Sequence, residues 1–343
     1  MRVRARLRRA RHRLRCRLAP PALILMYHRV TELANDPYLL AVTPERFAGH
    51  LDAIRTHGVP MPLQELVRAL RQGKVPRRAV AVTFDDGYAD NLHHAKPLLT
   101  RYDVPATAFV TAGQVGRDRE FWWDELDRLL LQPGTLPPRL TLRANGSVRE
   151  WPLGEASTYS EEEYRRDCHW HVECRDDPGP RQRVFRALFD LLYLSPSTER
   201  WAILDELTAW AGARPVARAS HRALTSEETV RLAEGDLVEI GAHTVTHPVL
   251  ARLSLVEQRQ EIGQSKARLE AMLGHEVVSF AYPHGSSTPE TAASVGEAGF
   301  ACACSSHPDA VFRGVDRFQL PRLGVRDWDG DTFARWLRWW LGG

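Results

Sequence analysis

Short apolar runs recur along the chain, and most are followed by a longer stretch in which apolar residues come three and four positions apart. A short continuous apolar run is typical of a buried strand, whereas apolar residues spaced three and four positions apart are typical of an amphipathic helix. The pattern predicts strands at residues 22–30, 80–84, 106–110, 238–242, 277–282, 301–304 and 320–325. Helices are expected at 44–56, 63–71, 89–101, 254–273 and 289–298.

The expected helix at 254–273 has the clearest ends. Ser254 can cap its start, with Glu257 three residues later completing a capping box, and Gly274 follows its end. Strands that alternate with helices favour a parallel sheet with helices outside it. We therefore predict an α/β protein, a distorted (β/α)7-8 barrel, whose chemistry lies at the C-terminal ends of the strands.

Residues 116–222 break this alternation. Helical patterns occur at 121–131, 160–168 and 181–211, with a β-like stretch at 140–151. The segment is too long to be a simple loop. We interpret it as a mixed insertion between the third and fourth strands of one barrel domain that spans 19–343.

Positive charge is concentrated at the start of the chain. The formal net charge is +3, yet residues 1–18 carry nine Arg and no acidic residue, so the rest of the chain is net acidic. This basic tail could contact anionic lipid headgroups or nucleic acid. The alternatives are that it is a solvated start of the chain or the result of a misassigned start codon. Nothing else resembles a nucleic-acid surface, and no obligate protein partner is predicted.

Other features bear on the cellular location. No apolar run reaches the ~18 residues of a membrane span, and His28 interrupts the first run before it is as long as a signal-peptide core. The five Cys are an odd and sparse set, which favours a reducing compartment. Cys302 and Cys304 should face the same side of a strand as small core residues. We expect a cytoplasmic protein, with peripheral contact at the inner face of the membrane through the tail.

Polar residues that can carry chemistry follow three of the predicted strands. They are TFDDG at 83–87, HTVTH at 243–247 and FAYPHG at 280–285. Asp85 and Asp86 can converge only where the strand ends, and two close carboxylates are costly unless a cation or proton holds them. His243 and His247 can close on one metal ion. The alternatives are an acidic turn and a solvated or core His pair.

Asp86, His243 and His247 together form a two-His, one-carboxylate set with an open position for water, which is typical of a catalytic metal site. Asp85 then remains as a general base. The turn at Pro283 and His284 could direct a backbone N–H toward an oxyanion. An ordinary strand-to-helix turn is the alternative.

In this order the three motifs resemble the polysaccharide deacetylase (NodB-homology, carbohydrate esterase family 4) family, over about residues 22–115 and 224–341. The resemblance implies a distorted barrel, a divalent metal with zinc as the expected ion, and hydrolysis of acetamido groups on an N-acetylated glycan. Water bound to that metal would attack the acetyl carbonyl. By position, Asp85 matches the base of the family, and Asp86, His243 and His247 match its metal ligands.

Two departures from the family pattern concern the catalytic groups. The family usually has an Arg where this sequence has Ala281, and we predict that Arg322 reaches the same place. The late Leu-x-His motif that supplies a general acid is missing, so His28, His284 and His307 are candidates. We favour His28, because it ends the first predicted strand. The alternative is that His28 only orders the strand ends.

Some assignments stay open. Trp122, in an aromatic cluster at 121–126, could stack on sugar rings, or it packs within a helix. The Trp-rich helix expected at 333–341 could lie on a membrane surface, or it packs against the barrel. Two alternative functions also stay open. An O-acetyl esterase or small-molecule amidase would use the same metal chemistry, whereas a glycan-binding pseudoenzyme would catalyse no reaction.

Overall fold

The computed structural model describes residues 21–144 and 146–342, which fall into two units. The first holds residues 21–32, 41–115 and 224–342. The second holds Leu33–Leu40 and Gly116–Ala223. The insertion expected at 116–222 thus lies in a unit of its own. That unit also includes Leu33–Leu40, which the sequence pattern did not single out. The basic tail at 1–18 lies outside the described residues.

The first unit is built on a parallel sheet whose strand order is β13-β12-β11-β6-β5-β1-β14, with β4 pairing with β5 beside this path. The pairs of this sheet are parallel throughout. The strands are β1 Leu23–Tyr27, β4 Val59–Pro60, β5 Ala79–Phe84, β6 Ala106–Val110, β11 Val238–Ala242, β12 Ser279–Ala281, β13 Cys302–Cys304 and β14 Leu323–Gly324.

The segment before and within β14 brings the two ends of the sheet together. Leu323 pairs with Leu25 of β1, whereas Leu320 forms a parallel bridge with Cys304 of β13. The amide of Ser305 also donates to the carbonyl oxygen of Leu320 at 2.8 Å. The sheet therefore curls toward a closed barrel, and the predicted α/β barrel class is confirmed.

The strand predicted at 22–30 is wrong near its C-terminal end, because β1 stops at Tyr27 and the strand breaks at His28. Beyond the break, β2 (Arg29–Val30) pairs with β3 (Ala41–Val42) in a separate two-stranded sheet. The amide of Val30 donates to the Asp90 carboxylate at 3.0 Å instead of joining the β1 ladder. The break leaves His28 at the end of β1, next to the end of β5.

Alternate residues of the strands enter two different cores. On β5, Val80 and Val82 belong to the larger core that the outer helices cover. Ala79 and Ala81 belong to a second core, inside the curled sheet, together with Phe109, Cys302 and Cys304. The prediction that the two Cys share one buried face is confirmed. Space is short beside Phe109 in this interior, because a Cβ on Gly241 would lie 2.5 Å from the Phe109 ring.

Helices cover the outside of the sheet, and the expected helix at 254–273 has the caps that its sequence predicts. The Glu257 amide donates to the Ser254 hydroxyl at 3.3 Å, the Ser254 amide donates back to Glu257 at 2.9 Å, and Gly274 ends the helix with φ 74°. The helices are α2 Pro44–His57, α3 Leu63–Gln72, a π-helical turn Asn91–Ala95, α4 Lys96–Tyr102, α9 Ser226–Ala233, α10 Leu255–Leu273, α11 Pro289–Glu297 and α12 Gly330–Trp340, with short 3-10 turns at Leu250–Arg252 and Pro283–Gly285.

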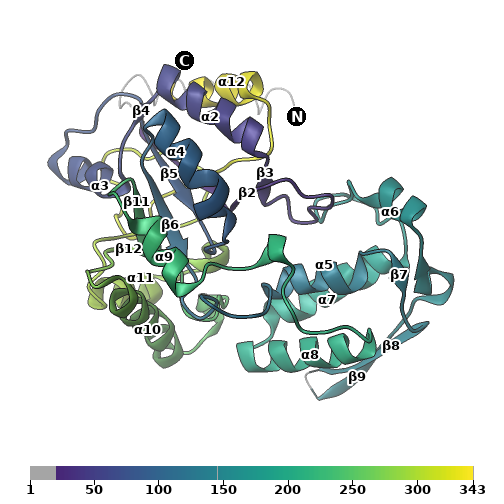
Figure 1. Ribbon diagram of the computed structural model, residues 1–343. Coiled ribbons are helices and arrows are strands. Elements are labelled where there is room, and N and C mark those ends of the chain that lie inside the picture. The colour runs from purple at the N-terminus through teal and green to yellow at the C-terminus, as the bar shows by residue number, and fades with distance from the viewer. Residues whose placement is uncertain (1–20, 145, 343) are drawn as a thin grey trace, which may run out of the picture. The chain divides into compact units, whose positions relative to one another are not determined.

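The C-terminal helix packs against the barrel unit rather than standing apart. In Figure 1, α12 lies beside α2, and Phe333 and Leu337 on its inner face are buried. Within the described part of the chain, no helix is both long and apolar enough to span a bilayer. The packing alternative for this Trp-rich helix is thus favoured.

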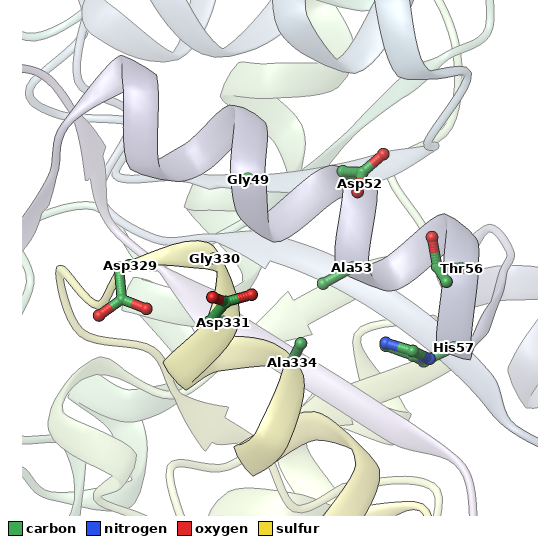
Figure 2. Close-up of a pocket in the computed structure, with 9 residues that line it drawn as sticks. All are labelled: Gly49, Asp52, Ala53, Thr56, His57, Asp329, Gly330, Asp331 and Ala334. Atoms are coloured by element: carbon green, nitrogen blue, oxygen red, sulfur yellow. The ribbon is translucent and has the colours of Figure 1, made fainter.

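A pocket of about 390 Å³ lies between α2 and α12. Figure 2 shows that Asp52 and His57 of α2 and Asp329 and Asp331 at the start of α12 are among its lining residues. None of the residues that the sequence predicts for the catalytic site lines this pocket. It belongs to the outer helix layer of the barrel unit.

The second unit combines helices with short antiparallel strand pairs. Its core contains Arg181, which is 1% exposed and donates hydrogen bonds to five backbone carbonyl oxygens, including those of Leu130 and Ser157. The elements are α5 Trp122–Leu130, β7 Gly134–Thr135, β8 Arg139–Ala144, β9 Ser147–Pro152, a 3-10 turn Gly154–Ser157, β10 Thr158–Tyr159, α6 Glu161–Asp167, α7 Pro180–Leu194, α8 Ser197–Trp210 and a 3-10 turn Ala219–His221.

His50 of α2 is a buried titratable group outside the predicted site. Its side chain is 0% exposed, its Nε2 donates to the Trp328 carbonyl oxygen at 2.7 Å, and its ring stacks on Phe333 at 4.1 Å between centroids. Burial lowers the pKa of His50 from 6.5 to about 4. Between pH 6.5 and about pH 4, His50 is protonated in the unfolded chain but not in the folded chain. The free energy of unfolding therefore falls as the pH falls through this range.

We therefore expect His50→Gln to change how stability depends on pH. The variant should be less stable than the wild type at pH 7, and the difference should shrink by about 3 kcal/mol on going to pH 4, because Gln cannot titrate. Urea unfolding of both proteins across this range measures the difference. A gap that stays constant with pH would show that His50 does not titrate as burial predicts.

Candidate active site

Asp85 and Asp86 follow β5 at a corner of the backbone. The Asp85 amide still donates to the Tyr27 carbonyl oxygen at 3.0 Å, but Asp86 has φ 76° and Gly87 has φ 88°. A left-handed residue interrupts the alternation of a strand, so two adjacent side chains need not point to opposite faces. Both carboxylates are buried, at 4% and 3% exposure. Asp86 and Gly87 together form the corner that the sequence assigned to Gly87.

His243 and His247 stand on the turn after β11. The Nδ1 of His243 lies 2.8 Å from the Ala281 carbonyl oxygen. Because a carbonyl can only accept, Nδ1 carries the hydrogen, and Nε2 keeps its lone pair for a metal ion. Burial lowers the pKa of His243 to about 4, so the imidazole is neutral near pH 7. A neutral imidazole is the form that binds metals.

The three predicted metal ligands come together in the structure. Oδ1 of Asp86 lies 3.7 Å from Nε2 of His243 and 3.3 Å from Nε2 of His247, and one donor atom from each residue lies within 4.8 Å of the others. Two ligands of one tetrahedral zinc ion would be about 3.4 Å apart. Burial alone would raise the pKa of Asp86, but the hydrogen bond and charge of His247 lower it. These donors therefore fit a divalent ion such as zinc.

Asp85 forms a buried ion pair with Arg322. Nη1 and Nη2 of Arg322 donate to the two carboxylate oxygens at 2.6 and 2.7 Å, and Nε donates to the Ser305 carbonyl oxygen at 3.0 Å. Burial alone would raise the pKa of Asp85, but the Arg322 guanidinium holds it well below its usual range. The contact expected from the sequence is thus present, and Asp85 is ionised near neutral pH. That Arg322 takes part in catalysis stays a prediction.

His28 lies near both carboxylates. Nδ2 of Asn91 donates to its carbonyl oxygen at 2.9 Å, and the charge of its imidazole contributes to the lowered pKa values of Asp85 and Asp86. The side chain is partly exposed. This position is compatible with proton delivery, and the role of His28 as general acid stays a prediction.

The turn of the third motif lies beside the predicted metal ligands. The ring of His284 is 4.5 Å from that of His247 and is exposed, whereas Pro283 is buried. The Tyr282 amide donates to the Cys304 carbonyl oxygen at 3.1 Å. An oxyanion or substrate contact at Pro283 and His284 stays a prediction. His307, the third candidate acid, is exposed.

Trp122 belongs to the second unit, where it is 2% exposed. Its ring contacts Trp123 at 5.4 Å and Phe189 at 5.0 Å between centroids, and the Arg200 guanidinium lies 5.2 Å from its ring centre. A ring covered in this way has no open face for a sugar. These contacts favour the helix-packing alternative over the predicted substrate contact.

Two supporting groups have no signal in the sequence. The Ala281 carbonyl that orients His243 belongs to a residue with no functional side chain, and Glu261 of α10 accepts hydrogen bonds from the turn between the two His ligands. Glu261 is one of several acidic residues on an amphipathic helix. Only the packing of α10 against β11 distinguishes it.

The family model described as polysaccharide deacetylase matches residues 72–134 and 202–303. These segments contain Asp85 and Asp86 as well as both His ligands and the third motif. Over these two segments the chain matches the polysaccharide deacetylase family.

Curated relatives match a limited part of the chain. A poly-beta-1,6-N-acetyl-D-glucosamine N-deacetylase of Staphylococcus aureus (strain MSSA476) is 31% identical over 110 residues, which cover 28% of this chain and 38% of that protein. A putative polysaccharide deacetylase, YxkH, of Bacillus subtilis (strain 168) is 31% identical over 108 residues, with 31% and 37% covered. The match thus spans less than half the length of these relatives.

Solved structures share the fold over most of the chain. The deacetylase PplD of Streptococcus pyogenes has a TM-score of 0.57 at 17% identity, covering 92% of this chain and 98% of that one. IcaB from Ammonifex degensii has a TM-score of 0.58 at 19% identity, covering 94% and 97%. At this identity the likeness shows a common fold.

We expect His243→Ala to lower the bound zinc well below one equivalent, because the variant removes one of three protein ligands. Elemental analysis after dialysis against buffered zinc measures the content. His284→Ala is the matched control, since it removes a neighbouring imidazole that is not in the donor set, and it should keep its metal. Full occupancy in the His243 variant would refute the ligand assignment.

Proposed function

We propose that this chain is a metal-dependent deacetylase that hydrolyses N-acetyl groups of a glycan or polysaccharide precursor. One observation carries the proposal: a buried, ionised carboxylate at Asp85 lies beside the donor set of Asp86, His243 and His247. A base next to a metal site with room for further ligands is an arrangement that hydrolyses acyl bonds. The acetamido substrate is supported by the name of the S. aureus relatives.

In this proposal, Asp86, His243 and His247 hold the divalent ion, with zinc as the expected metal. When bound, the ion would polarise the acetyl carbonyl and make water more acidic. Asp85 takes a proton from the attacking water, and it can do so near neutral pH because Arg322 keeps it ionised.

Groups around Asp85 and the metal site carry out the remaining steps. The turn at Pro283 and His284 offers a backbone donor to the carbonyl oxygen as negative charge develops there. The departing amine needs a proton, and His28 supplies it from the end of β1. An imidazole suits this step because its ordinary pKa lies near neutral pH.

Acetate release tests the proposed function directly. Purified protein, stripped of metal and reloaded with zinc, is given a panel of N-acetylated oligosaccharides and their O-acetylated counterparts. Zinc-dependent acetate release from the N-acetyl set supports the proposal. Release from the O-acetyl set alone would make the protein an esterase, and glycan binding without release in either set would make it a binding protein.

Asp85→Asn should lower the rate by roughly 10²-fold or more while keeping the metal, because general-base catalysis contributes on this scale. Asn is nearly isosteric with Asp and cannot accept the proton from water. Initial rates and zinc content are measured on the same preparations. Loss of zinc in this variant would instead make Asp85 a ligand.

Arg322→Gln should move the acidic limb of the pH–rate profile upward by at least about one pH unit. Without the guanidinium, burial raises the pKa of Asp85, so the base is protonated at pH values where the wild type is active. Arg322→Lys keeps a positive charge and should move the limb less. An acidic limb that stays at the wild-type pH in both variants would show that Arg322 does not set the pKa of the base.

A further inference from the structure

The turn between the two His ligands has an unfavourable backbone conformation. Thr244 has φ 63° and His247 has φ 55°. Side chains other than Gly rarely adopt this left-handed region, and a β-branched residue such as Thr244 is an outlier there. Such a conformation persists only where surrounding groups hold it. The placement of His243 and His247 therefore depends on what anchors residues 244–246.

A single carboxylate anchors this turn from the side of α10. Oε2 of Glu261 accepts from the backbone amides of Val245 and Thr246 at 2.8 and 2.9 Å, and Oε1 accepts from the Thr246 hydroxyl at 2.7 Å. The helix that carries Glu261 is itself fixed, because Ile262 and Ser265 on the same helix are completely buried. Glu261 thus ties the turn to a rigid element.

The end of β6 holds the same turn from the other side. The amides of Ala112 and Gly113 donate to the carbonyl oxygens of Thr244 and Val245, each at 3.0 Å. The approach is so close that a Cβ on Gly113 would lie 2.4 Å from the Val245 oxygen. The turn is therefore fixed between β6 and α10, and neither Glu261 nor Gly113 is one of the three metal donors.

We propose that Glu261 is a positioning residue for the metal centre: by holding the turn at 244–246, it sets the placement of His243 and His247 and thereby the affinity for zinc. The inference rests on the metal site of the proposed function. It does not depend on which acetylated substrate is used, and zinc binding tests it without any measurement of activity.

Three variants of the full chain separate this role from ordinary helix packing. Glu261→Ala removes the contacts with the turn. Glu261→Gln keeps an oxygen that can accept from both backbone amides while it removes the charge. Glu270→Ala is the matched control, because Glu270 lies on the same helix and accepts from the Val277 amide at 3.0 Å and from Lys266 at 2.6 Å. Zinc dissociation constants are measured by competition with a chromogenic chelator, and Tm is measured without metal.

Glu261→Ala should raise the zinc dissociation constant about tenfold or more, the scale on which loss of groups that support metal ligands acts. Glu261→Gln should stay within about threefold of the wild type, and Glu270→Ala should lower Tm without changing zinc affinity. An unchanged dissociation constant in Glu261→Ala, or an equal loss of affinity in Glu270→Ala, would overturn the proposal.

If Glu261→Ala does not fold, a milder variant decides the question. Thr246→Val removes the 2.7 Å hydroxyl contact with Oε1 of Glu261 and leaves both backbone amides of the turn in place. It should weaken zinc binding, and wild-type affinity in Thr246→Val would overturn the proposal. Wild-type protein that binds zinc but releases no acetate would refute the proposed function while leaving the role of Glu261 in place.

Discussion

The buried ion pair between Asp85 and Arg322 is the interaction on which the rest of the site depends. Asp85 directly follows β5, and Arg322 lies between the bridge at Leu320 and the pairing at Leu323 that bring the ends of the sheet together. A carboxylate so deeply buried would take up a proton if it stood alone. The guanidinium keeps it charged, and Arg322 is carried by the segment that links the two ends of the sheet. Closure of the barrel and the charge of the proposed base therefore depend on the same segment.

The candidate metal site depends on a second constraint, which is backbone strain at the ends of strands. Asp86, Thr244 and His247 all have left-handed φ values. These corners turn donors from β5 and β11 toward one point, which regular strands could not do because their side chains alternate between two faces. The strain is borne by neighbouring groups: the Thr111 amide donates to the Asp86 carbonyl oxygen at 3.1 Å, and Glu261 holds the His turn. Strain of this kind is commonly found at functional sites.

The sequence predicted much of the fold because the signals concerned are local. The strands β6 and β11 occur at the residues that their apolar runs predict, and α10 has the capping box that Ser254 and Glu257 form. The prediction of one strand at 22–30 was wrong at its end, because Arg29 and Val30 leave the β1 ladder and bond to Asp90, far along the chain. Short strands such as β4, with two residues, have no periodicity to detect.

The division between what the sequence determined and what the tertiary structure decided follows the distance over which each interaction acts. Residue types and spacing were enough to identify Asp86, His243 and His247 as a donor set, because each motif directly follows its own strand. The sequence could name Arg322 as a partner of Asp85 but could not place it, since 237 positions separate the two residues. It contained no signal for Glu261 or the Ala281 carbonyl, whose roles come only from packing. A carboxylate on a helix and a carbonyl in a strand acquire a function when the fold brings a strained turn against them.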